Sequence, residues 1–131
     1  MDLKDMLARY TCVLYKDEQV YTSTQRGVRP LLEALDAGCY VNFSAADRVV
    51  GSGAAFMYCL LQVKAVYAQT ISLRGKEILE SSGISVTFDN LVPAIQNRKG
   101  DGLCPMELAT AHCHTPEEAR LAMLEALKKL S

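Results

Sequence analysis

Apolar residues recur along the chain at the two spacings that distinguish helices from strands. Leu3, Met6 and Leu7 follow a helical period, whereas the β-rich runs 11–15 and 19–23 flank a polar turn and predict a hairpin. The alternation of helical and strand patterns that follows predicts right-handed crossovers and an α/β fold with a sheet that is at least partly parallel. Further strands are predicted over residues 39–43, 64–72 and 84–88, and further helices over residues 31–35, 45–62, 73–82, 105–112 and 116–130.

The longest predicted helix covers residues 45–62. Ser44 is followed three residues later by Asp47, which is the spacing of a capping box with Asp in the place of the usual Glu. The segment is apolar on nearly all sides, so we expect this helix to be central and buried. Gly51-Ser52-Gly53 would then lie inside the helix, where each glycine costs about 1 kcal/mol relative to alanine. Tight packing against a neighbouring element, or the close approach of a ligand, would offset that cost.

Glycines and polar residues separate the predicted elements. Gly38 and Gly83 end two of the helices, residues 89–95 are expected to form a short helix or turn, and residues 97–102 form a polar loop. No internal repeat, low-complexity segment or linker interrupts this pattern. A chain of 131 residues is also of the usual size for one domain, so we expect residues 1–131 to form a single domain.

Composition and charge argue against several classes of function. The chain carries 14 basic and 15 acidic residues, a net charge of −1, and shows no electrostatic footprint for nucleic acid or for an anionic membrane. Its five cysteines have no close paired spacing, and its first residues lack the apolar core of a signal peptide. We expect a cytoplasmic protein with reduced thiols and without nucleic-acid or membrane partners. The oligomeric state is left open, a homodimer included.

Three short motifs follow one another along the chain: Asp47-Arg48-Val49-Val50-Gly51 with Ala54-Ala55, then Asn97-Arg98, then Cys104-Pro105-Met106-Glu107. Together they resemble an uncharacterised prokaryotic family, the domain of unknown function family eighteen-ninety-three, from about Leu3 to Leu127. The resemblance implies the fold of the cytidine deaminase-like superfamily, a three-layer α-β-α sandwich with a mixed sheet. The family pattern has a lysine where this chain has Ser52, so a role that needs a fixed positive charge there is not expected.

The resemblance to deaminases does not extend to their catalytic residues. A zinc deaminase needs His (or Cys)-x-Glu at the start of the central helix and Pro-Cys-x-x-Cys at the start of the next helix. Without three ligands no zinc-bound hydroxide forms, so we expect no deamination, no metal and no other cofactor. The two corresponding segments here are Ala45-Ala46-Asp47-Arg48 and Ser72-Leu73-Arg74-Gly75-Lys76, which hold neither His, Glu nor Cys.

Two side chains are candidates for catalysis. Cys104 precedes Pro105, with Glu107 in the same first turn, which places the thiol at a helix N-cap where backbone N–H groups favour the thiolate. Cys104 is therefore a candidate nucleophile or redox thiol, and the alternative is a half-buried capping residue. Asp47 is a candidate general base or ligand-binding carboxylate, and the alternative is a cap shared with Ser44. We expect Asp47 and Cys104 to share one pocket.

The other candidate residues would bind a ligand in the former active-site cleft. Arg98 offers a planar fork for a phosphate or carboxylate group, with an exposed loop arginine as the alternative. We expect a domain that binds a small polar or nucleotide-like ligand. Two alternatives stay open: an enzyme that uses Cys104, with Asp47 or Glu107 assisting, and a regulatory or assembly module with a vestigial pocket. The candidate ligand-binding residues are Gly51, Ser52, Asn97, Arg98 and Glu107.

Overall fold

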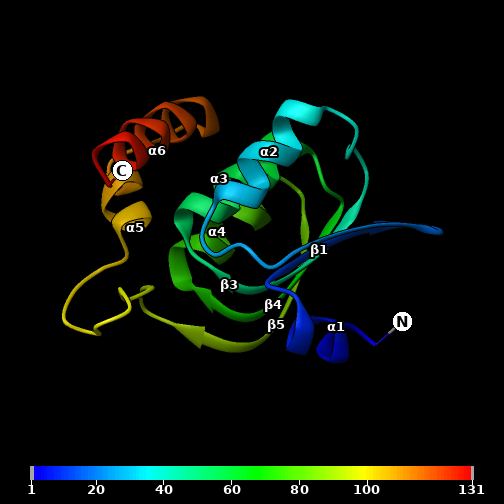
Figure 1. Cartoon of the computed structure of the whole chain (residues 1–131). Helices are drawn as coiled ribbons and strands as arrows, with labels where there is room; N and C mark the ends of the chain where they lie inside the picture. The colour runs from blue at the N-terminus through cyan, green and yellow to red at the C-terminus, as the bar shows by residue number, and fades with distance from the viewer. Residues whose placement is uncertain (1, 131) are drawn as a thin grey trace.

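A five-stranded mixed sheet forms the centre of the fold in the computed structural model, which describes residues 2–130 (Figure 1). The strands are β1 (Cys12–Lys16), β2 (Gln19–Ser23), β3 (Ser44–Val50), β4 (Ala65–Ser72) and β5 (Ser85–Val92). Their order across the sheet is β2-β1-β3-β4-β5. β1 is antiparallel to both of its neighbours, whereas β3, β4 and β5 run parallel.

Helices lie on both faces of the sheet and make it the middle of three layers (Figure 1). They are α1 (Leu3–Arg9), α2 (Arg29–Ala37), α3 (Ser52–Leu61), α4 (Leu73–Ser81), α5 (Pro105–Thr110) and α6 (Pro116–Leu130). α2, α3 and α4 cover one face, α1 packs on β1 and β3 from the other, and α5 and α6 pack on α3. None of the helices within residues 2–130 is long and apolar enough to cross a membrane.

The parallel half of the sheet is built from two crossovers, in which α3 joins β3 to β4 and α4 joins β4 to β5. α3 is the centre of the core: Met57 and Tyr58 are fully buried there. Burying a side chain such as Met57 stabilises the fold by about 1.5–3 kcal/mol. α4 begins where the Ser72 hydroxyl accepts the N–H of Gly75 at 3.0 Å. The structure confirms the predicted hairpin, the partly parallel sheet and most of the predicted helices.

An arginine attaches the last two helices to the rest of the molecule. Arg74 in α4 donates from Nη1 to the carbonyl of Thr110 at 2.5 Å and from Nη2 to the carbonyl of Cys113 at 2.7 Å. Its guanidinium also lies over the ring of Phe56, 5.5 Å from the centroid. A cation at the end of α5 is favourable because the last carbonyls of a helix carry partial negative charge. Arg74 therefore links α4 and α3 to the segment that connects α5 and α6.

The segment around Asp47 differs from the prediction. β3 contains Asp47, and the strand predicted over residues 39–43 is wrong. The helix begins only at Ser52, and Gly51, with φ −97° and ψ −170°, is its N-cap. A central strand that is covered on both faces is apolar almost throughout, and periodicity does not distinguish such a run from a buried helix. The capping box predicted from the spacing of Ser44 and Asp47 is therefore wrong, because both residues lie in a strand.

The packing of α5 and α6 on α3 explains why position 53 is a glycine. A Cβ at Gly53 would lie 2.8 Å from Met123 Sδ and 3.3 Å from Met106 Cβ. The glycine therefore allows α5 and α6 to pack closely on α3, which is one of the two explanations that the sequence offered. Gly51 lies outside the helix, so the helix cost expected there does not arise.

β5 is also longer than predicted. It extends to Val92, so the short helix or turn expected over residues 89–95 is wrong for its first four residues. Asp89 and Asn90 disfavour strands in general, but edge strands tolerate exposed polar side chains. Pro93 follows the strand, and a proline has no N–H with which to continue the ladder.

Candidate functional site

A cavity of about 370 Å³ lies where β3 gives way to α3. Its walls come from the start of β1, the loop before α2, the end of β3, the first turn of α3, residues 95–98 and the start of α5. The volume is within the range of natural small-molecule sites, roughly 300–1,000 Å³. Five of the candidate residues line this one cavity: Asp47, Gly51, Arg98, Cys104 and Glu107.

Asp47 presents a half-buried carboxylate to the cavity from β3. Its Oδ2 accepts the hydroxyl of Tyr58 at 2.6 Å, and its Oδ1 accepts the N–H of Val49 at 3.3 Å. Burial raises the pKa of Asp47 to about 7, while the bonds from Tyr58 and the backbone act in the opposite direction. Asp47 therefore changes its charge near neutral pH, which suits either a general base or a carboxylate that binds a ligand N–H.

Tyr58 and Cys12 extend this group behind Asp47. The Tyr58 hydroxyl lies 3.4 Å from Cys12 Sγ, and Cys12 stands opposite Asp47 in the β1–β3 pairing. Burial, with the nearby Asp47 charge second, raises the pKa of the Cys12 thiol and that of Tyr58 well above their usual ranges. Both stay neutral while Asp47 titrates. The sequence analysis singled out neither residue. Assigning a strand to the segment around Asp47 would have allowed it to pair with the predicted strand 11–15, which contains Cys12.

Glu107 is held inside the protein by the start of α3. Its side chain is buried, and its Oε1 accepts the N–H of Ser52 at 2.6 Å while its Oε2 accepts the Ser52 hydroxyl at 3.2 Å. The Ser52 hydroxyl also lies 2.7 Å from Thr110 Oγ1. A Cβ at Gly51 would overlap Glu107 Oε1. Glu107 therefore joins α5 to α3 as a wall of the cavity, and Ser52 lies fully buried behind it rather than lining the cavity.

Cys104 and Asn97 have different places in the segment before α5. Cys104 is the N-cap of α5, as expected, and it lines the cavity half-buried. Its thiol makes no hydrogen bond within residues 2–130. Asn97 closes its own loop instead, since its Oδ1 accepts the N–H of Gly100 at 2.8 Å and its Nδ2 donates to Asp101 at 2.9 Å. It does not line the cavity.

Two exposed arginines line the cavity from separate loops. Arg26 lies before α2 and Arg98 before α5, and neither has an ion-pair partner in the described part of the chain. Arg48 is different, because its guanidinium donates to the carbonyl of Leu7 at 2.7 Å and to that of Ala8 at 3.2 Å.

The first turn of α3 also lines this cavity. Gly53 and Ala54 line it, and N–H groups in the first turn of a helix have no partner inside the helix. The N–H of Ser52 is already bonded to Glu107.

The start of α3 also corrects the comparison with deaminases. The helix begins with Gly51-Ser52-Gly53 rather than with the segment around Asp47, and α4 begins with Ser72-Leu73. Neither start supplies His, Cys or Glu. Within residues 2–130, no three His, Cys, Asp or Glu side chains are grouped in a way that could hold a metal ion.

Comparisons with known proteins give a family and a fold. Residues 3–127 match the family model described as "TM1506: Domain of unknown function (DUF1893)". A crystal structure of a DUF1893 family protein (TM1506) from Thermotoga maritima is similar with a TM-score of 0.84 at 22% sequence identity, and the match covers 94% of this chain and 85% of that chain. At this identity the likeness shows the fold alone. No curated protein matches the chain.

The environment of Asp47 predicts a pH-dependent stability. Its pKa is about 7 in the folded protein, against about 3.9 in an unfolded chain, so the protonated form stabilises the fold. This stabilisation is complete below about pH 4 and is lost as the pH rises through about 7, by on the order of 2–4 kcal/mol. Urea unfolding of the Asp47→Asn variant across this range should lack that loss. Asp36→Asn, at a position that is 78% exposed, is the control. An unchanged pH slope in Asp47→Asn would contradict the assignment.

The fit between Glu107 and Gly51 predicts a coupling between two substitutions. Gly51→Ala should displace the carboxylate, and Glu107→Ala should leave the Ser52 N–H unpaired, so each should lower the free energy of unfolding by about 1–3 kcal/mol. The double variant should lose less than the sum, by on the order of 1 kcal/mol, because the added methyl enters the vacated space. Chemical denaturation measures the cycle, with the exposed Glu125→Ala as control. If the two changes in the free energy of unfolding are simply additive in the double variant, the residues at positions 51 and 107 do not compete for one space.

Proposed function

Because the chain belongs to the DUF1893 family, a family described only as a domain of unknown function, we propose its function from its own cavity: it binds a small polar, nucleotide-like metabolite beside the start of α3. The ligand carries an anionic group and, some distance from it, a hydrogen-bond donor. The proposal rests on one observation. A single cavity is lined by two unpaired arginines, by the first turn of α3 and by one carboxylate that titrates near neutral pH.

The arginines and the helix start favour the anionic group. An arginine side chain binds phosphate or carboxylate with two parallel hydrogen bonds, and Arg26 and Arg98 reach the cavity from two different loops. The first turn of α3 lines the same cavity at Gly53 and Ala54, and the N–H groups of these two residues remain for an anion because only that of Ser52 is bonded to Glu107. Neither feature would favour a cationic ligand.

The other linings favour a ligand with an apolar or ring-shaped body. Val28, Ile95 and Met106 contribute aliphatic surface to the cavity. Asp47 would accept an N–H or O–H group of the ligand when ionised. A nucleoside monophosphate combines these parts, since it has a phosphate, a flat ring and ring donors, and it is the representative probe for this class.

Two wider expectations belong to the same proposal. We place the three-layer fold in the cytidine deaminase-like superfamily, which the mixed sheet with two parallel crossovers supports. We also place the protein in the cytoplasm, since all five cysteines are free thiols. Covalent catalysis by Cys104 has less support, because no side chain within hydrogen-bonding distance activates its thiol in the described part of the chain.

Thermal unfolding with a panel of small molecules tests the binding. Nucleoside monophosphates should raise the Tm more than the matching nucleosides or inorganic phosphate do, because only the first combine both parts of the ligand. At a concentration of about 100 times Kd the stabilisation should be about 2.7 kcal/mol. The double variant Arg26→Ala/Arg98→Ala should lose most of the shift.

Two controls make this result specific. Arg9→Ala removes an exposed arginine that does not line the cavity and should keep the shift. Native mass spectrometry of the purified protein should in addition show a bound small molecule that the double variant lacks. If no member of the panel raises the Tm and no compound is released on denaturation, the binding proposal is wrong.

A further inference from the structure

β5 is a long and largely uncovered edge of the sheet. It has eight residues, of which six are exposed and only Val86 and Val92 are half-buried. Phe88 and Leu91 are 36% and 43% exposed. No strand within residues 2–130 pairs with its outer side. Natural proteins usually protect such an edge with lysine, proline, a bulge or a short strand, and β5 contains no lysine and no proline.

The opposite edge of the sheet is protected in the usual way. β2 has only five residues, and it follows Lys16 at the end of β1 and the turn residues Asp17 and Glu18. Because a short edge flanked by charges resists pairing with another chain, the two edges of the sheet are not equivalent. The difference makes β5 the edge that is open to pairing with another chain.

The backbone of β5 shows which groups are available. The N–H of Ser85 donates inward to the carbonyl of Lys64 at 3.2 Å. In a parallel pair, alternate residues direct both backbone groups to the same neighbour, so those of Val86, Phe88 and Asn90 face outward. Val86 and Phe88 stand beside the buried Val66 and Ala68 of β4, which places them on the face that α3 and α4 cover.

We propose that β5 pairs antiparallel with β5 of a second copy of this chain, about a two-fold axis that passes through Phe88. A two-fold axis perpendicular to the sheet leaves equivalent side chains of the two copies on the same face of the joined sheet. One residue of β5 must then stand directly opposite the same residue of the second copy. With Phe88 on the axis, its ring meets the ring of the second Phe88, and aromatic pairs across strands are favourable. The two five-stranded sheets then form one continuous sheet.

An axis one residue further along the strand, through Asp89, is electrostatically less favourable than one through Phe88. With Asp89 on the axis, two carboxylates would stand directly opposite each other, and like charges in that position are destabilising. With Phe88 on the axis, Asp89 of the second copy stands opposite Thr87 instead. The single charge of the strand therefore disfavours an axis at Asp89, whereas the pair of Phe88 rings favours the axis at Phe88.

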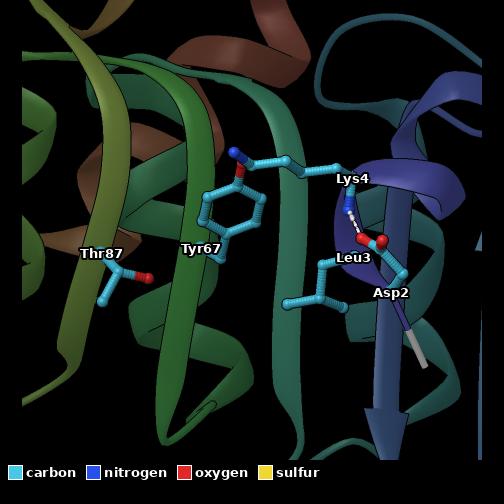
Figure 2. Close-up of a pocket in the computed structure, with 5 residues that line it drawn as sticks. All are labelled: Asp2, Leu3, Lys4, Tyr67 and Thr87. Atoms are coloured by element: carbon cyan, nitrogen blue, oxygen red, sulfur yellow. Dashed lines mark hydrogen bonds between the residues drawn. The ribbon is translucent and has the colours of Figure 1, made fainter.

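The surface beside Thr87 complements that carboxylate. Figure 2 shows Lys4 of α1 extending over Tyr67 towards Thr87, along a shallow groove of about 640 Å³ that α1 leaves open on the sheet. The Lys4 ammonium has no ion-pair partner within residues 2–130. Asp89 accepts the hydroxyl of Tyr67 at 2.6 Å in its own chain and lies on this same face. Placing Asp89 of the second copy beside Thr87 brings it towards Lys4.

Sedimentation velocity on the full chain at about 100 μM tests the association, since the fraction of chains in a dimer rises with concentration. The wild type should sediment with twice the 14.4 kDa of one chain. Phe88→Lys should sediment as one chain, with circular dichroism confirming that it is folded. Val20→Lys places the same charge on the other edge, at a residue that is 49% exposed, and should remain a dimer.

Disulfide trapping tests the axis without requiring the lysine variant to fold. Directly opposite residues on paired strands have Cα atoms about 5.5 Å apart, within reach of a disulfide, whereas residues one step away from the axis exceed about 7 Å. In a Cys39→Ser background, Phe88→Cys should therefore form covalent dimers on oxidation and Asp89→Cys should not. A monomeric wild type, a dimer that Val20→Lys breaks and Phe88→Lys does not, or trapping at Asp89 alone would each overturn the proposal.

Discussion

The candidate site depends on the contact between the buried carboxylate of Glu107 and the first N–H of α3. Burying a carboxylate is unfavourable unless it is hydrogen-bonded, and here the Ser52 N–H, the Ser52 hydroxyl and the positive end of a helix all meet it. The contact requires a glycine at position 51, because a side chain there would take the space of the carboxylate. It fixes α5 on α3, and so it fixes the position of Cys104 in the cavity relative to Asp47.

Local sequence patterns were sufficient for most of the fold and insufficient at its centre. The hairpin around Asp17 and the helices before Gly38 and Gly83 depend on turn and capping chemistry within a few residues, and such signals can be read from sequence. The segment 44–50 depends on which neighbours cover it. Alanines and valines fit a buried strand as well as a buried helix, so its assignment needed the pairing with β1 and β4.

The candidate site shows the same division. Asp47 and Cys104 line one cavity although Asp47 lies on a strand rather than at a helix start, because the end of β3 and the start of α3 are adjacent in space. The motif Cys104-Pro105-Met106-Glu107 did not reveal that Glu107 accepts a hydrogen bond inside the protein, since its partner Ser52 is remote in sequence. The sequence did not single out Tyr58, because its bond to Asp47 is a tertiary contact. Local sequence patterns therefore do not reveal hydrogen bonds between residues that are far apart in the chain.

The cavity is enclosed by two parts of the chain that differ in how they are held. The Asp47 side belongs to the hydrogen-bonded sheet and to α3. The Cys104 side follows the last strand and is attached by helix packing, by Glu107 and by Arg74. Within residues 2–130, no residue after Val92 takes part in the ladders of the five-stranded sheet. Local opening of such an attachment requires less free energy than global unfolding. A compound bound there as proposed would therefore leave while the sheet stays intact, and its residence time would depend on how firmly the two C-terminal helices are docked.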